Sequence, residues 1–223
     1  MDLNLNDQGL LENPRDIQAW LEEMGVEHYT LRYDEQRDGL VVDVKWSVYF
    51  EGKLGALTQL PVQFGKVAGS FNCAHNQLTS LVGAPQAVRH SFYCYQNKIT
   101  SLTGAPHSVP GDFYCDNNLL TSLAGTLQAV GRDFSCEHNN LTSLTGDLLI
   151  VGGYFNCSNN HLTSVAGAPL VGEYSSFPHH LTIQGIGEID SYGNLVVSPK
   201  NYHAYLAAVQ QLLVQQAGQD LFY

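Results

Sequence analysis

Apolar and polar positions follow one recurring pattern through the middle of the chain. Each copy has a phenylalanine, a cysteine two residues later and leucines at fixed places beyond it. The copies are FNCAHNQLTSLVGAP from Phe71, FYCYQNKITSLTGAP from Phe92, FYCDNNLLTSLAGTL from Phe113, FSCEHNNLTSLTGDL from Phe134 and FNCSNNHLTSVAGAP from Phe155. The period is 21 residues and is kept without insertion. Such a period predicts stacked coils that share one core.

The spacing within a copy predicts which side chains face the core. Phenylalanine and cysteine are two residues apart, so in an extended strand both point to one side and their neighbours point away. The leucines at Leu78 and Leu81, with their equivalents, and the valine at Val88 are expected inside as well. An asparagine follows each cysteine by three residues, where it can bond the backbone at the end of the strand. These asparagines are Asn76, Asn97, Asn118, Asn139 and Asn160.

All cysteines of the chain occupy the same repeat position, which argues against a unique nucleophile. They are Cys73, Cys94, Cys115, Cys136 and Cys157. Side chains stacked in a line do not suit the disulfide dihedral of about 90° or the tetrahedral arrangement of a metal site. We therefore expect buried, reduced thiols, with no disulfide, no metal and no cofactor.

The repeat resembles a leucine-rich repeat in which phenylalanine and cysteine take two strand leucine positions. The phase of L-T-S-L-x-G-A-P is most similar to the short repeats of bacterial effector proteins and of phage relatives. The resemblance covers about residues 49–172 and implies an α/β solenoid with parallel strands on a concave, protein-binding face and short convex segments. Effectors of this kind often carry a catalytic domain, and we expect none here, so a ubiquitin-ligase activity is not implied.

The flanking segments are predicted to cap the array. Residues 1–48 contain a helix that begins after Asn13, ends near Gly25 and carries an apolar stripe, followed by a hairpin around Asp38 and Gly39. Residues 49–172 then form a degenerate first coil and five full repeats. At the same offset of 21 residues, Gly52 would take the cysteine position and Gly55 the asparagine position of that first coil.

Residues 173–223 are expected to form the C-terminal cap. Short strands are predicted in LTIQGIGEI and LVVS, and a helix is predicted after Ser198 and Pro199. A partner-binding role for this helix is an alternative to capping. The sequence around the pair His179 and His180 does not align with the repeat, and there a turn is favoured over a ligand pair.

The net charge of the chain limits the classes of partner that it is expected to bind. The net charge of −11 disfavours nucleic acid and anionic membranes and favours a basic partner. The chain has no apolar run long enough to span a bilayer and no signal-peptide pattern. We take a cytoplasmic location as the default, with export by a specialised secretion system left open. The oligomeric state is also left open.

The outward strand positions carry the candidate site. Read from coil to coil, they form an aromatic patch that grades into an acidic one, without lysine or arginine. Tyrosines beside charges of one sign suit a binding face. The candidate partner-binding residues are Tyr93, Tyr95, Asp112, Tyr114, Asp116, Asp133 and Glu137.

These features favour a protein that is not an enzyme and that binds a basic protein, as an immunity protein or antitoxin would. One alternative is a secreted effector scaffold that binds a host protein. The other is an enzyme with a site in residues 173–199. The alternative without a binding role is that the acidic, tyrosine-containing face is an ordinary solvated sheet surface. His75 and His138 share a repeat position with Gln96, Asn117 and Asn159, which indicates a solvated rim rather than catalysis.

Overall fold

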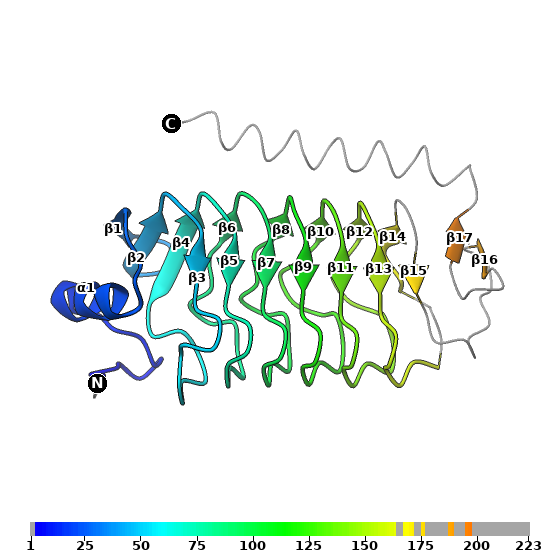
Figure 1. The fold of residues 1–223 in the computed structure, drawn as a ribbon, viewed down its shortest axis with the longest axis horizontal. Coiled ribbons are helices and arrows are strands. Elements are labelled where there is room, and N and C mark those ends of the chain that lie inside the picture. Colours follow the sequence, from blue (N-terminus) through cyan, green and yellow to red (C-terminus); the bar gives the residue numbers. More distant parts are fainter. Residues whose placement is uncertain (1–2, 164–166, 172–174, 177–186, 190–194, 198–223) are drawn as a thin grey trace.

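The computed structural model describes residues 3–163, 167–171, 175–176, 187–189 and 195–197 (Figure 1). Its main feature is a row of coils, each of which adds one strand to a long parallel sheet. The predicted C-terminal helix, His179 and His180 lie outside the described residues.

Seven strands form this sheet. They are β3 (Val48–Tyr49), β5 (Phe71–Asn72), β7 (Phe92–Tyr93), β9 (Phe113–Tyr114), β11 (Phe134–Ser135), β13 (Phe155–Asn156) and β15 (Ser175–Ser176). Phenylalanine pairs with phenylalanine from β5 to β13, so the rings stack inside the coils. The rings of Phe92 and Phe113 lie 5.1 Å apart and 6° from parallel. All five cysteines are buried beside them, as predicted.

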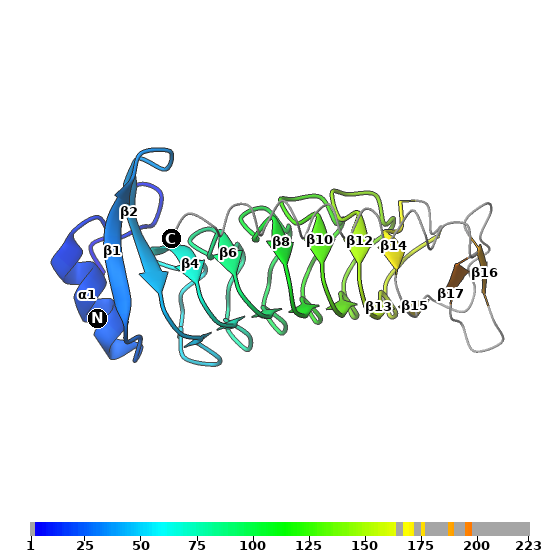
Figure 2. The ribbon, with the colours of Figure 1, turned by 90° about the horizontal axis from the view of Figure 1, so that it is seen from above.

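A second line of parallel strands was not predicted from the sequence. It runs through the inward valines and consists of β4 (Gln63–Val67), β6 (Ala87–Val88), β8 (Ser108–Val109), β10 (Ala129–Val130), β12 (Ile150–Val151) and β14 (Leu170–Val171). Strands β4 and β6 belong to one sheet, and β8 to β14 to another (Figure 2). Each coil therefore has two strands separated by a short turn.

The asparagines form the predicted ladder, which we call the Asn ladder. The side-chain amide of Asn97 donates to the carbonyls of Cys73 and Cys94, at 3.0 and 3.1 Å. Its carbonyl oxygen accepts the backbone N–H of Leu78 at 3.0 Å. Asn118, in the coil after that of Asn97, repeats this arrangement. One side chain thus pairs buried backbone groups of two neighbouring coils, which would otherwise be unpaired.

The N-terminal helix and hairpin lie where the sequence places them. Helix α1 (Pro14–Glu23) starts at Asn13, whose side chain accepts the N–H of Arg15, and it is followed by Gly25 with φ of 71°. Strands β1 (Tyr29–Asp34) and β2 (Gly39–Val44) form the antiparallel hairpin. Trp20 of α1 is buried, and its ring lies edge-on to Phe50 at 5.3 Å. Strand β2 pairs in parallel with β4, which joins the hairpin to the coils.

The first coil is longer than the sequence predicts. Val48 pairs with Phe71, an offset of 23 residues, and only from β4 onward does the offset of 21 hold, as Val67 pairs with Val88. The N–H of Gly52 bonds Ala74, as the N–H of His75 bonds Tyr95. Gly52 therefore takes the position of His75, and the assignment of Gly52 and Gly55 to the cysteine and asparagine positions is wrong.

The described residues form a β-solenoid with little helix, which corrects the predicted α/β class. The coils run in a nearly straight row in both views, so the expected concave surface is close to flat (Figures 1 and 2). Beyond residue 172, β15 continues the long sheet, and β16 (Gly187–Ile189) pairs antiparallel with β17 (Leu195–Val197). No helix in the described ranges is long and apolar enough to cross a membrane.

Candidate functional site

The candidate site is the outer surface of the seven-stranded sheet, which we call the strand face. Three columns of side chains build it: one residue before each inward phenylalanine, one between phenylalanine and cysteine, and one after the cysteine. All seven residues predicted from the sequence lie in these columns and are half-buried. The sheet brings them together on three neighbouring coils because β7, β9 and β11 pair in register.

The tyrosines of the strand face are packed side by side. The rings of Tyr93 and Tyr114 lie 5.5 Å apart, and the ring of Tyr95 lies edge-on to His75 at 5.1 Å. Burial and then the nearby carboxylates of Asp112 and Asp133 raise the pKa of Tyr114 to about 12. Burial also raises the pKa of Tyr95, with Glu51 as the next cause. Both hydroxyls are therefore neutral at physiological pH.

The column before the phenylalanines has a structural role that sequence reasoning missed. From the first coil to the fourth full repeat, an oxygen of this side chain accepts the backbone N–H of the same position in the next coil. Asp112 accepts from Asp133 at 3.3 Å, and Asp133 accepts from Tyr154 at 2.8 Å. Serines do the same earlier in the array, where Ser91 accepts from Asp112 at 3.0 Å. We call this series, from Ser47 through Ser70, Ser91, Asp112 and Asp133, the oxygen ladder.

The other two predicted carboxylates also have partners in neighbouring coils. Asp116 accepts from the hydroxyl of Ser135 and, at 3.0 Å, from the N–H of Glu137. Burial raises the pKa of Asp116 and outweighs these bonds. Glu137 accepts from the amides of Asn156 at 3.1 Å and Asn159 at 2.8 Å. Asp116, like Asp112 and Asp133, therefore helps to hold backbone, whereas Glu137 bonds side chains only.

The corrected register adds two residues to the strand face. Tyr49 and Glu51 of the first coil fall in its second and third columns, and Tyr49 is 55% exposed. The alternation of Val48 and Phe50 as inward residues indicates that Tyr49 and Glu51 face outward, but it does not fix their columns. Conversely, Asn72, Ala74 and Ser91 are buried, although their columns were predicted to face solvent.

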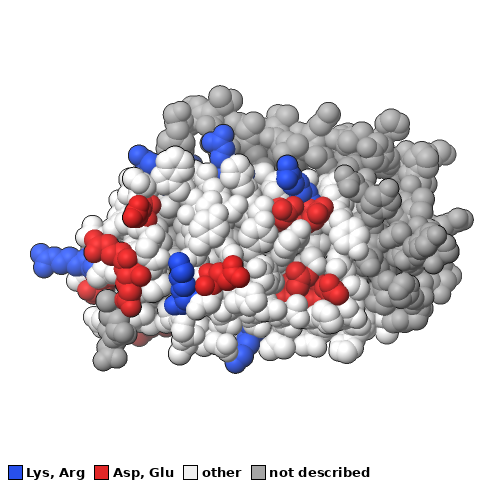
Figure 3. All heavy atoms as spheres, viewed as in Figure 1, with Lys and Arg blue, Asp and Glu red and all other residues white. Residues whose placement is uncertain are grey.

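Charge on the strand face lies in separate groups. Figure 3 shows acidic side chains in clusters, with mostly uncharged surface between them and single basic side chains next to some of the clusters. The bonds above define two of the groups, Asp112 with Asp133 and Asp116 with Glu137. No lysine or arginine lies in the three columns from the first coil to the fifth repeat. With Tyr49 and Glu51 of the first coil included, acidic and aromatic residues also lie outside the predicted gradient, which runs from Tyr93 and Tyr95 to Asp133 and Glu137.

The cysteines form no reactive site. Burial raises the pKa of Cys73 to about 12 and that of Cys115 well above its ordinary value. All five cysteines are reduced and buried. Within the described ranges no group of three or more His, Cys, Asp or Glu side chains could hold a metal ion.

His75 and His138 occupy a position that the backbone restricts. With Gln96, Asn117 and Asn159 they have φ between 51° and 55°, in the left-handed region. Asparagine and histidine are enriched there among residues other than glycine. Gly52, with φ of 64°, is their equivalent in the first coil. The mixture of residue types in this position therefore follows from backbone conformation as well as from exposure.

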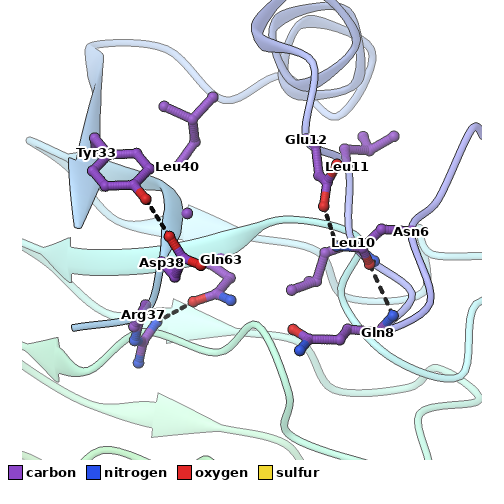
Figure 4. Close-up of a pocket in the computed structure, with 11 residues that line it drawn as sticks. Asn6, Gln8, Leu10, Leu11, Glu12, Tyr33, Arg37, Asp38, Leu40 and Gln63 are labelled. Atoms are coloured by element: carbon purple, nitrogen blue, oxygen red, sulfur yellow. Dashed lines mark hydrogen bonds between the residues drawn. The ribbon is translucent and has the colours of Figure 1, made fainter. Parts of the chain in front are cut away.

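A shallow pocket lies at the N-terminal end, between residues 6–12, the hairpin and β4 (Figure 4). Several of its polar groups bond one another or the backbone. The hydroxyl of Tyr33 donates to Asp38, and the guanidinium of Arg37 donates to Gln63 and to the carbonyl of Phe64. Burial lowers the pKa of Arg37. The bonds of Arg37 hold the hairpin against β4.

No protein-family model, no curated protein and no solved structure matches this chain. The other segment considered from the sequence, residues 173–199, lies mostly outside the described residues.

Proposed function

We propose that this protein binds a basic protein partner on its strand face and catalyses no reaction. The observation that supports this most is the charge of the face. The three columns hold the carboxylates of Glu51, Asp112, Asp116, Asp133 and Glu137 and no lysine or arginine. Like charges on adjacent strands cost stability unless something offsets them. A cationic partner would supply that offset.

The arrangement of side chains also suits binding. Tyrosines supply large contact area with little conformational entropy to lose, and rings held by neighbours lose even less. Tyr93 and Tyr114 contact each other, and hydrogen bonds fix the carboxylates around them. A nearly flat surface of this kind can cover a complementary surface. Inhibition by occlusion, as by an immunity protein or antitoxin, is the biological version that we propose.

Two structural hypotheses belong with this function. The first is a relationship to leucine-rich repeats, supported by the regular inward positions and by the Asn ladder. The second is that α1 and the hairpin cap the array. Burial of Ile17, Trp20 and Leu21 in the same core as the coils supports it. Capping would leave the strand face as the surface available to a partner.

Binding to a defined cationic peptide tests the proposal. Fluorescence anisotropy of a labelled decalysine peptide at low salt would report the affinity, with a labelled decaglutamate peptide as the charge control. The variant Glu51→Lys/Glu137→Lys should lose most of the decalysine affinity. These two glutamates are chosen because their bonds are to side chains, so the oxygen ladder stays intact.

A matched variant distinguishes the effect of charge on the strand face from the effect of the net charge of the protein. Glu22→Lys/Glu23→Lys changes the charge by the same amount on exposed positions of α1, away from the strand face. It should bind decalysine nearly as well as the wild type. Equal losses in both variants would show that net charge alone attracts the peptide. Circular dichroism would confirm that each variant is folded.

A further inference from the structure

Two histidines lie beside glutamates at the edge of the strand face. The Nε2 atom of His75 lies 3.5 Å from Oε1 of Glu51, and that of His138 lies 3.5 Å from Oε1 of Glu137. The side chains are exposed by 42% and 55%, so both imidazoles reach solvent. These two glutamates are also the acidic residues of the face that do not hold backbone.

The groups that face each histidine come from its own coil and from the neighbouring coils. His75 faces Glu51 from the first coil and the ring of Tyr95 from the third, and Lys53 follows in the first coil without an ion pair to Glu51 among the described residues. His138 faces Glu137 in its own coil and the amide of Asn159 in the next, 3.3 Å from its Nε2. Asp116 lies near through its bond to the Glu137 N–H.

The left-handed backbone at these positions restricts but does not require histidine. Asparagine fills the same slot at residues 117 and 159 with the same φ. Asparagine would satisfy the backbone equally well and would carry no titratable group. Histidine at two of these positions, each next to a glutamate, therefore adds a titratable group that the backbone conformation does not require.

We infer that His75 and His138 make partner binding sensitive to protons, so that acidification releases a basic partner from the strand face. This inference rests on the proposed function. Histidine is the side chain that ordinarily gains its charge between about pH 7 and pH 6. Each protonated ring places a positive charge beside Glu51 or Glu137. The face then carries two cations against its five carboxylates and attracts a basic partner less.

The test compares decalysine binding at pH 7.5 and pH 5.5 and at constant ionic strength. Lysine ammonium groups keep their charge across this range, so the pH acts on the protein. Wild type should bind about threefold to tenfold more weakly at pH 5.5. The variant His75→Asn/His138→Asn should bind as wild type does at pH 7.5 and should lose far less on acidification. Its backbone conformation is already present at Asn117 and Asn159.

A control histidine lies on the other side of the coils. His107, exposed just before β8, is outside the strand face, so His107→Asn should respond to pH as the wild type does. Equal affinities of the wild type at both pH values would overturn the inference. The same decrease in the double variant would also overturn it, by assigning the effect to the remaining histidines or to carboxylates. Absence of binding at pH 7.5 is a different result, because it would refute the proposed function itself, and this inference with it.

Discussion

At the scale of single residues, the Asn ladder should dominate stability. Asn118 is buried, accepts the N–H of Ile99 at 2.9 Å and donates to carbonyls of two coils. Asn118→Ala removes these bonds and leaves buried backbone groups unpaired. We expect a loss of about 2–4 kcal/mol in the free energy of unfolding, measured by urea denaturation.

Asn140, which follows the ladder residue Asn139 in the next coil, is the control for this substitution. Its side chain is exposed, and the coil contact at this residue is a backbone bond to Leu120. Asn140→Ala should change the free energy of unfolding by less than about 0.5 kcal/mol. Similar midpoints for the two variants would show that the Asn ladder contributes little.

The buried thiols should be unreactive in the native protein. Burial raises the pKa of every cysteine, so the thiolate needed for reaction with an aromatic disulfide reagent is absent at pH 8. No thiol should react in buffer and all five should react in denaturant. Thr142→Cys, at an exposed position, provides a reactive control. Since unfolded thiols ionise at lower pH than folded ones, stability should also fall as the pH rises above about 9.

At the scale of elements, a residue of the oxygen ladder contributes an acceptor oxygen to stability and a charge to the strand face, and substitutions can remove these two properties separately. Asp133 accepts the N–H of Tyr154 and also contributes charge to the strand face. Asp133→Asn keeps an acceptor oxygen and removes the charge, whereas Asp133→Ala removes both. We expect Asp133→Ala to lose about 1–2 kcal/mol of stability and Asp133→Asn to stay close to the wild type. Thermal denaturation would compare them, and equal destabilisation would argue against the ladder.

The repeated elements could be predicted from the sequence because five copies constrain them together. Inward phenylalanines, cysteines and ladder asparagines all follow from the spacing. The first strand could not be placed, since offsets of 21 and 23 residues differ by two. A shift of two keeps the same side chains inward, so Val48 and Phe50 are buried in either register. Backbone pairing alone distinguishes them, and with it the places of Tyr49 and Glu51.

The position of the candidate site on the sheet could be predicted from the sequence, whereas the hydrogen bonds of its residues could not. The columns place the seven predicted residues correctly because alternation along a strand fixes their side of the sheet. Their bonds to the next coil depend on side-chain rotamers and on the step between coils, which one sequence does not specify. The second line of strands escaped prediction because each coil contributes only a residue pair, such as Ala87–Val88, without alternation to reveal it.

At the scale of the whole molecule, the coils should lose structure from the end inward. Stability in a repeat array is a sum of units and their neighbour contacts, so damage to one end weakens the nearest coils first. Trp20 joins α1 to the first coil through Phe50 and is buried. Trp20→Ala leaves a cavity at this end of the core, for which core substitutions of this size cost about 3–5 kcal/mol.

Hydrogen exchange followed by mass spectrometry can locate that loss. In Trp20→Ala, amides of β3 and β5 should exchange much faster than in the wild type, whereas those of β9 and β11 should stay protected because their partners are untouched. Tyr33→Ala is a suitable control, since its ring is 58% exposed at the same end and contributes little to the core. Uniform acceleration along all strands would mean that the molecule unfolds as one unit. An effect limited to the first coils would support α1 as a cap. It would also mean that the acidic residues on the coils of β9 and β11 keep their structure.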